Sequence, residues 1–330
     1  MTSLAVGRRR ERVLPPPVTG QEAVLLGVIA VIWVLLGVFT PAFLSDNSIQ
    51  PLLVRLAPIG VMAVGMTLVI ISGGIDISVA ASLMVCSVVT AKLLVSTGMP
   101  MLPALAISLA LGGLLGAING VLIAYGRVHA IIITFGTANL FLFLGLRIFD
   151  SQTVNNIPNT FSFLSRGEDG RTLGVPHSFL LMFAIVVVAW WYVRHVASGR
   201  HFFAIGGDQH SARLAGIPVE RRIMSAYIIT GVLVGLAACM TLAGGTSTLD
   251  QNVGSGQELA VIAAVVIGGT SIMGGRGSVL GSVLGALLVQ TVRSGVTQMG
   301  WPTQLANLFV GLFIIIAVGA DLMRQRRRAR

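Results

Sequence analysis

The sequence predicts an all-α, polytopic membrane protein with about ten transmembrane helices, some of them broken or re-entrant. Of its 330 residues, 55% are hydrophobic and only 10% are charged, whereas soluble domains carry roughly 25% charged residues. Its 40 glycines are typical of helices that approach each other closely in lipid. The apolar run over residues 183–189 lacks the alternation of apolar and polar residues that membrane β-strands show. These observations argue against a soluble domain and against a β-barrel.

Ten apolar segments follow one another along the chain, each near the roughly 20 residues that a helix needs to cross a bilayer. Two places leave the count open. Only Gly126–Val128 separates the fourth segment from the fifth, and glycines interrupt the eighth, so eight or nine full spans with re-entrant pieces are the alternative. The spans are expected at residues 22–43, 51–71, 79–97, 101–125, 129–149, 177–196, 223–245, 257–273, 278–299 and 302–322.

Arginines are concentrated at the two ends of the chain, which has a net charge of +10. Because positive residues favour the cytoplasmic side and an even number of spans returns the chain to that side, both termini are expected in the cytoplasm. The same arginines would contact anionic lipids, and their placement argues against nucleic acid as a partner. The expected organisation is a basic tail over 1–20, a transmembrane domain over 21–323 and a second basic tail over 324–330.

A polar loop over residues 197–222 separates two apolar spans, and its arginines place it in the cytoplasm. A helix from Gln209 to Ala215 would bring His210, Arg213 and Leu214 near one another through three- and four-residue spacings. Leu214 offers an apolar knob and Arg213 a charge for an acidic groove. We therefore expect this loop to dock a partner; the alternative is that its arginine only fixes the topology.

Asp76 is the most distinctive single residue, because a carboxylate within the bilayer is costly unless it pairs or lines water. Gly73 and Gly74 precede it and indicate a helix end at the inner membrane surface. Two interpretations stay open: Asp76 or Ser78 caps the following helix, or Asp76 acts in gating or partner contact. The segment MGGRGSVLGS (273–282) repeats the pattern of SGGIDISVAAS (72–82). Broken helices in corresponding positions are typical of a transport pathway, and chance recurrence of glycine pairs is the alternative.

The segment ITFGTANLF (133–141) concentrates polar groups inside an apolar span. Its residues Thr134, Phe135, Thr137 and Asn139 surround a glycine, and small residues in mid-span can break a helix and expose backbone groups to a pore. Hydroxyl and amide groups beside an aromatic ring also suit a sugar-like solute. We expect a break in the helix here, on a solute pathway.

Other polar residues allow two interpretations each. Asp250, Asn252 and Glu258 lie in the connection between two late spans, where they form an ordinary polar loop or an outer entrance that contacts an external partner. Asn119 and Gln290 lie inside apolar spans, where hydrogen bonding between helices is favoured over solute contact.

No motif in the sequence indicates catalysis or a bound cofactor. It lacks a Gly-x-x-x-x-Gly-Lys-Ser/Thr phosphate loop, a His-Glu-x-x-His metal motif and a Gly-x-Ser-x-Gly nucleophile motif. Cys86 and Cys239 lie in apolar runs without metal-ligand spacing and are expected to be buried apolar residues. We therefore expect no enzymatic activity, no metal and no cofactor.

Four segments resemble, in the same order, the permeases of ribose-type ABC sugar importers. The resemblance covers nearly the whole chain after residue 20, and autoinducer, rhamnose and ribose permeases match about equally well. Asp208 replaces a usual asparagine, Ser211 a usual alanine, and TFGT stands for the usual Thr-Leu-Gly-Thr. The four segments are SGGIDISVAAS (72–82), INGVLIAYGRVHAIIITFGTANLFLFLGL (118–146), AIGGDQHSARLAGIPVERR (204–222) and VIAAVVIGGTSIMGGRGSVLGSVLGALL (261–288).

The resemblance implies a multi-pass permease of the bacterial plasma membrane that imports a sugar or sugar-like solute. It also implies two cytoplasmic ABC ATPase domains, which bind the ATP, an extracytoplasmic sugar-binding protein, and a second permease subunit in a homo- or heterodimer. The alternative is a secondary transporter, which would need a titratable group deep in a span. The implied ATPase-coupling residues are Gly206, Gly207, Asp208, His210, Arg213, Leu214 and Gly216. The expected gate or pathway residues are Gly73, Gly74, Asp76, Thr134, Phe135, Thr137 and Asn139.

Overall fold

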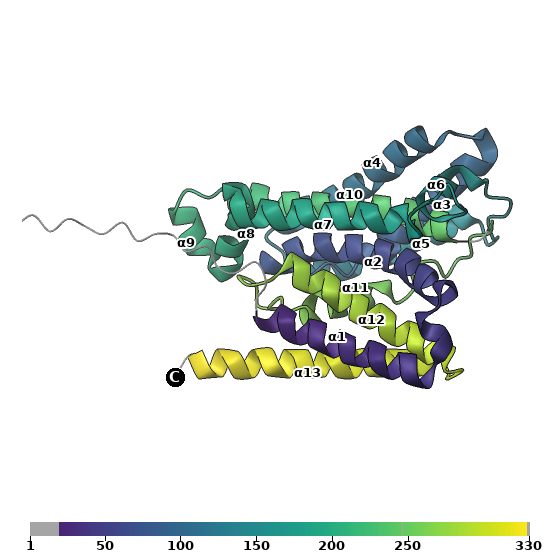
Figure 1. Ribbon diagram of the computed structural model, residues 1–330. Coiled ribbons are helices and arrows are strands. Elements are labelled where there is room, and N and C mark those ends of the chain that lie inside the picture. Colours follow the sequence, from purple (N-terminus) through teal and green to yellow (C-terminus); the bar gives the residue numbers. More distant parts are fainter. Residues whose placement is uncertain (1–19, 246, 329–330) are drawn as a thin grey trace, which may run out of the picture.

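The computed structural model describes residues 20–245 and 247–328, and long helices lying side by side dominate it (Figure 1). The first basic tail lies outside the described residues, apart from its last position, and the final helix continues into the second tail. The helices of the described part are α1 (Gly20–Phe39), α2 (Asp46–Ile71), α3 (Val79–Thr97), α4 (Met101–Ala124), α5 (Ala130–Phe149), α6 (Ser162–Ser165), α7 (His177–His195), α8 (Ala197–Gly207), α9 (Gln209–Leu214), α10 (Val219–Gly244), α11 (Gln257–Ile267), α12 (Val279–Gln298) and α13 (Gln304–Arg328), with short 3-10 helices at Pro41–Leu44 and Asn159–Phe161.

The predicted all-α architecture is confirmed, and each of the ten predicted spans contains a helix. Within the described residues, eight helices are long and apolar enough to cross a membrane, namely α1 to α5, α7, α10 and α12. The eighth predicted span, 257–273, is the broken one: α11 ends at Ile267, and the turn that follows contains glycines with positive φ at 269, 274 and 275. Two shorter apolar helices, at 257–267 and 304–319, complete the set.

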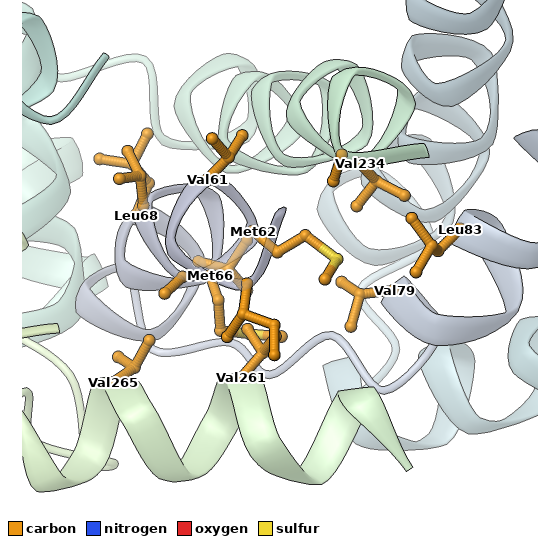
Figure 2. Packing of buried hydrophobic residues seen from close by; sticks show 14 of the residues in the cluster. Val61, Met62, Met66, Leu68, Val79, Leu83, Val234, Val261 and Val265 are labelled. Carbon is orange, nitrogen blue, oxygen red and sulfur yellow. The ribbon is translucent and has the colours of Figure 1, made fainter. Parts of the chain in front are cut away.

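Helix α2 forms the centre of the bundle. All its residues from Leu56 to Ile71 are buried, as expected for a helix that is apolar on every side. Figure 2 shows Met62 and Met66 of α2 extending toward α3 and α11, with Val234 of α10 at the upper right of the view. The neighbouring helices therefore shield α2 from the lipid, and its outward neighbours carry the exposed apolar side chains.

Helices α4 and α10 pack with their backbones in contact. A Cβ placed on Gly112 or Gly116 of α4 would overlap the backbone of α10, and one placed on Gly231 or Gly235 would overlap the backbone of α4. Each pair is spaced by four residues, which is the arrangement that lets membrane helices approach closely. Part of the high glycine content is thereby explained by helix contacts.

The two ends of the bundle differ. Helices α8 and α9 and the C-terminal end of α13 lie together at one end, on the left of Figure 1. The opposite end carries α6 and a two-stranded antiparallel hairpin, β1 (Arg171–Thr172) with β2 (Val175–Pro176), in which Arg171 pairs with Pro176. Backbone hydrogen bonds between Val154 and Leu249 join the two connections at this end.

Candidate functional site

A cavity of about 430 Å³ lies between α3, α5 and the connection at residues 251–258. We refer to it as the α3–α5 cavity. Its volume is within the usual range for a small-molecule site, roughly 300–1,000 Å³. The cavity brings together residues that the sequence assigned to two separate regions, because Phe135 and Asn139 line it beside Asn252 and Glu258.

The α3–α5 cavity has both polar and apolar lining residues. Amide groups come from Asn139, Gln251 and Asn252, and Glu258 adds a carboxylate from the first turn of α11. Met84, Leu142 and Leu146 are among the apolar lining residues, together with the ring of Phe135. Amides and a carboxylate both accept hydrogen bonds, and amides also donate them. The cavity can therefore hold a solute that has several hydroxyl groups and an apolar face.

Helix α5 presents two different faces. Thr134 and Thr137 are buried toward the rest of the chain, whereas Phe135 is 62% exposed and Asn139 is exposed beside the cavity. The predicted break at 133–141 is wrong, since α5 is continuous from Ala130 to Phe149. One mid-helix glycine costs only about 1 kcal/mol relative to alanine. The amide of Asn139 and the hydroxyl of Thr137 bond to carbonyl groups of their own helix, at Phe135 and Ile133.

Asp76 is 3% exposed, precedes the cavity-lining Ile77 and begins a chain of hydrogen bonds. Its Oδ1 accepts hydrogen bonds from the amide of Ser78, at 2.9 Å, and from the hydroxyl of Ser78, at 2.7 Å. The Asn119 side chain donates to that hydroxyl at 2.7 Å and accepts from the hydroxyl of Thr137 at 2.6 Å. The chain of bonds joins three elements that are distant in sequence: the 72–78 loop, α4 and α5.

The interpretation of Ser78 as the cap of α3 is wrong, whereas Asp76 accepts a hydrogen bond from the amide of Ser78, the residue that precedes the helix. Ser78 occupies the cap position of α3, but its side chain accepts no hydrogen bond from that helix. Its hydroxyl instead donates to Asp76 and accepts from Asn119. The predicted helix-to-helix role of Asn119 is confirmed, and Gln290 similarly donates from α12 to the carbonyl of Arg55 in α2.

The loop helices α8 and α9 form the predicted polar connection. Helix α9 begins at Gln209 as expected and ends at Leu214, one residue early. Asp208 caps it: its carboxylate accepts hydrogen bonds from the amides of His210 and Ser211 and from the hydroxyl of Ser211. These bonds, led by the one from the Ser211 hydroxyl, hold the pKa of Asp208 below its ordinary value. Asparagine caps a helix about as well as aspartate, so Asp208 keeps this function.

Helix α9 ends in a left-handed turn. Gly216 has φ +78°. Its amide donates to the carbonyl of Arg213, and the amide of Ile217 donates to the carbonyl of Ala212. This is the glycine-terminated pattern common at helix ends. Gly216 therefore determines the shape of the loop.

The side chains of α9 differ in whether they bond to other residues of the loop. Arg213 is not free for an acidic groove, because its Nε and Nη2 donate to Glu220 at 3.1 and 2.8 Å. Leu214 is 77% exposed, and His210 is also exposed. Gly207 has open space around it, whereas Gly206 packs against the ends of two other elements. Only Ala212 of α9 is buried, and among the exposed side chains His210 and Leu214 have no ion pair within the loop.

The remaining predicted residues, Asp250, Gly73 and Gly74, lie in the connections between helices. Asp250 lies outside the cavity lining, and its carboxylate accepts a hydrogen bond from the amide of Asn252 at 2.6 Å, which shapes the turn at the cavity edge. Gly73 and Gly74 follow α2, where Gly73 has φ +87°. Sequence reasoning missed Gln251 of the cavity, although its place between Asp250 and Asn252 was a usable signal. It also missed Gly275, which contacts Gly206 although the two are far apart in the sequence.

The sequence of this chain is similar to those of known transport permeases. A family model described as the permease component of branched-chain amino acid transport systems matches residues 48–318. The ribose import permease RbsC of Escherichia coli is 34% identical, over 91% of this chain and 92% of its own length. The D-allose transport permease AlsC of the same species is 33% identical, over 89% of both chains.

The autoinducer 2 import permease LsrD of Photorhabdus laumondii is also similar, with 31% identity over 91% of this chain and 90% of its own length. No solved structure matches the chain. The family match covers most of the sequence and all but the first of the long apolar helices. The chain is therefore a multi-pass membrane protein of the branched-chain amino acid transport permease family.

Proposed function

We propose that this chain is the membrane-spanning permease subunit of an ATP-driven importer for a sugar or sugar-like solute. The α3–α5 cavity is the observation that carries the proposal, because amide and carboxylate groups, an aromatic ring and apolar side chains line it together. Such a lining suits a ring with hydroxyl groups at its edge and C–H groups on its face. The ribose, allose and autoinducer import permeases among its relatives support the same class of solute.

We assign α9 to contact with a cytoplasmic ATPase domain, one for each of two permease subunits. Its support is the exposed Leu214 and His210 on a short helix that is fixed at both ends, by Asp208 and by Gly216. The surface proposed for this contact consists of these two side chains. Burying a leucine side chain contributes about 1.5–3 kcal/mol, which is roughly tenfold to a hundredfold in the association constant.

The proposed orientation places α8, α9 and both termini in the cytoplasm of a bacterial cell. Arginines at the chain ends and in the loop favour this arrangement. The common location of α9 and the end of α13 is consistent with it (Figure 1). The connection at 251–258 then faces outward, where an extracytoplasmic binding protein delivers the solute. A second permease subunit against α5 would close the α3–α5 cavity beside the exposed ring of Phe135.

The direct test is reconstitution in lipid vesicles with the ATPase and the binding protein of the proposed importer. Uptake of labelled ribose, allose and fructose is measured without ATP, with ATP inside the vesicles and with ATP outside them. ATP-dependent uptake of one of them, only with the binding protein present, is expected. Uptake driven by a proton or sodium gradient without the ATPase would contradict the proposal.

A single substitution tests the assigned contact. Leu214→Glu places a charge on the proposed surface and is expected to weaken ATPase binding at least tenfold while the permease still inserts in the membrane. Leu173→Glu is the matched control, because Leu173 is 99% exposed in the hairpin at the opposite end of the bundle. Equal ATPase binding by the two variants would refute the role of α9.

A further inference from the structure

Three backbone segments meet in direct contact at the end of the bundle that carries α8 and α9. They are the end of α2 with Gly73, the end of α8 at Gly206, and the turn between α11 and α12 at Gly275. The amide of Gly275 donates to the carbonyl of Ile71 at 2.9 Å. A Cβ on Gly206 would overlap both that carbonyl oxygen and that amide nitrogen. We call this contact the glycine junction.

The two loops of the junction also touch each other. A Cβ on Gly274 would lie 3.0 Å from the Cα of Gly73 and 3.0 Å from the carbonyl oxygen of Gly206. These are the two Gly-Gly segments whose sequence similarity suggested corresponding broken helices. Gly73, Gly274 and Gly275 all have positive φ, which side chains other than glycine rarely adopt. The three segments therefore pack backbone to backbone, with no flexible side chain between them.

The loop that starts at the junction ends at the α3–α5 cavity. Ile77 lines the cavity, and only the five residues 72–76 separate it from Ile71. That length spans at most about 20 Å even when extended. Along the way, Thr134 donates to the carbonyl of Ile75 at 3.1 Å, and Asp76 is held by Ser78. The segment 72–78 is thus fixed to the pathway helices at one end and to the glycine junction at the other.

We infer that the glycine junction transmits movement of α8 and α9 to the solute cavity through segment 72–78. This inference rests on the proposed function, in which α9 contacts the ATPase. Close-packed elements cannot shift independently, so small displacements at one contact are passed on to the next. When the ATPase moves α9, Gly206 displaces the ends of both broken segments together. Gly206 is therefore a positioning residue: it touches neither ATPase nor solute, and couples one to the other.

Alanine substitution at adjacent positions provides a matched test. Gly206→Ala introduces a methyl group that has no room, whereas Gly207→Ala introduces one that meets nothing within 4 Å. Both residues lie at the end of α8, and neither belongs to the proposed ATPase surface. The measurement is the number of solute molecules imported per ATP hydrolysed by the reconstituted complex. This ratio does not depend on how much protein folds, so a merely structural role for Gly206 would leave it unchanged.

The Gly206→Ala complex is expected to bind the ATPase and to hydrolyse ATP, but to import at least tenfold fewer solute molecules per ATP hydrolysed. Gly207→Ala is expected to keep the wild-type number of solute molecules per ATP. An unchanged ratio in Gly206→Ala would overturn the inference while leaving the proposed function intact. A wild-type complex without ATP-dependent uptake would instead refute the proposed function itself.

Hydrogen exchange on the wild-type complex covers the case in which Gly206→Ala fails to assemble. Exchange is compared between the nucleotide-free complex and the complex trapped with ATP and vanadate. Peptides over 72–78 and 273–277 are expected to change exchange together with the peptide over 208–215. A change limited to 208–215 would show that movement stops at α9, and the inference would be wrong.

Discussion

Replacing Asn119 tests whether the chain of hydrogen bonds from Asp76 to Thr137 fixes segment 72–78 to helices α4 and α5. Asn119 is 1% exposed and makes two interhelical hydrogen bonds, to Ser78 and to Thr137. In Asn119→Ala both are lost. The partners keep other bonds, because Ser78 still donates to Asp76 and Thr137 to a carbonyl of its own helix. Neither hydroxyl is left without a partner, which limits the cost of the substitution.

The expected loss of stability follows from these bonds. Hydrogen bonds between membrane helices contribute about 0.6 kcal/mol on average and up to about 1.7 kcal/mol. The loss of two predicts a decrease of about 1–2 kcal/mol in the free energy of unfolding, with a lower thermal midpoint in detergent. Segment 72–78 would also lose its link to α4, so the KM for uptake is expected to increase several-fold.

Asn139→Ala is the control, because it is expected to affect uptake without affecting stability. Asn139 is exposed at the cavity, and its amide bonds only to a carbonyl of its own helix. Its removal is expected to leave the thermal midpoint unchanged but to raise the KM for uptake, because the cavity loses a polar group. Thermal unfolding of the purified permease and uptake in vesicles are measured for both variants. A wild-type midpoint for Asn119→Ala, or a lowered one for Asn139→Ala, would refute this assignment of roles.

Three further outcomes are expected. Gly231→Ala overlaps a carbonyl oxygen of α4, whereas Gly113→Ala meets only a side-chain methyl at 3.0 Å, so thermal unfolding should show a loss of about 1–3 kcal/mol for the first and little for the second. Asp208→Asn should keep ATPase stimulation and Asp208→Ala should lower it. Folding lowers the pKa of Asp208, so its carboxylate stabilises α9 fully above the ordinary pKa, and this stabilisation is lost as the pH falls through the lowered pKa. Amide hydrogen exchange in α9, measured against pH, would detect the loss. A loss of protection already at neutral pH would contradict this prediction. Reporter fusions at Arg330 and near Ser165 should report opposite sides of the membrane, and the same side for both would contradict the proposed topology.

Apolar segments could be located from the sequence because burial in lipid depends on composition over about twenty residues. The broken span at 257–273 could also be recognised, since its glycines occupy backbone conformations that end a helix. The cap at Asp208 and the helix that begins at Gln209 depend on neighbours within four residues, and local sequence contains that information. Local signals thus sufficed for the helices and for the shape of α9.

The predictions of a cap at Ser78 and of a break in the 133–141 segment were wrong for a common reason. Both treated a local pattern as if nothing distant competed with it. The hydroxyl of Ser78 could have capped α3, but Asn119, 41 residues away, and Asp76 occupy it. The helix at 133–141 could have broken at its glycine, but Thr134 and Thr137 bond to the loop and to α4 with the helix intact. Hydrogen bonds between distant elements decided both cases.

Glycine illustrates how the same residue acquires different functions from its tertiary contacts. Gly216 is free of close contacts and is required for a left-handed backbone, which a sequence can indicate. Gly231 has ordinary helical geometry and is required because α4 lies against it, which only the packed bundle shows. Gly206 and Gly207 are neighbours in one short motif, and the resemblance gave them the same role. The structure separates them: a side chain has room at Gly207 but none at Gly206. Conversion of ATP-driven movement into transport is therefore expected to depend on Gly206 and to tolerate change at Gly207.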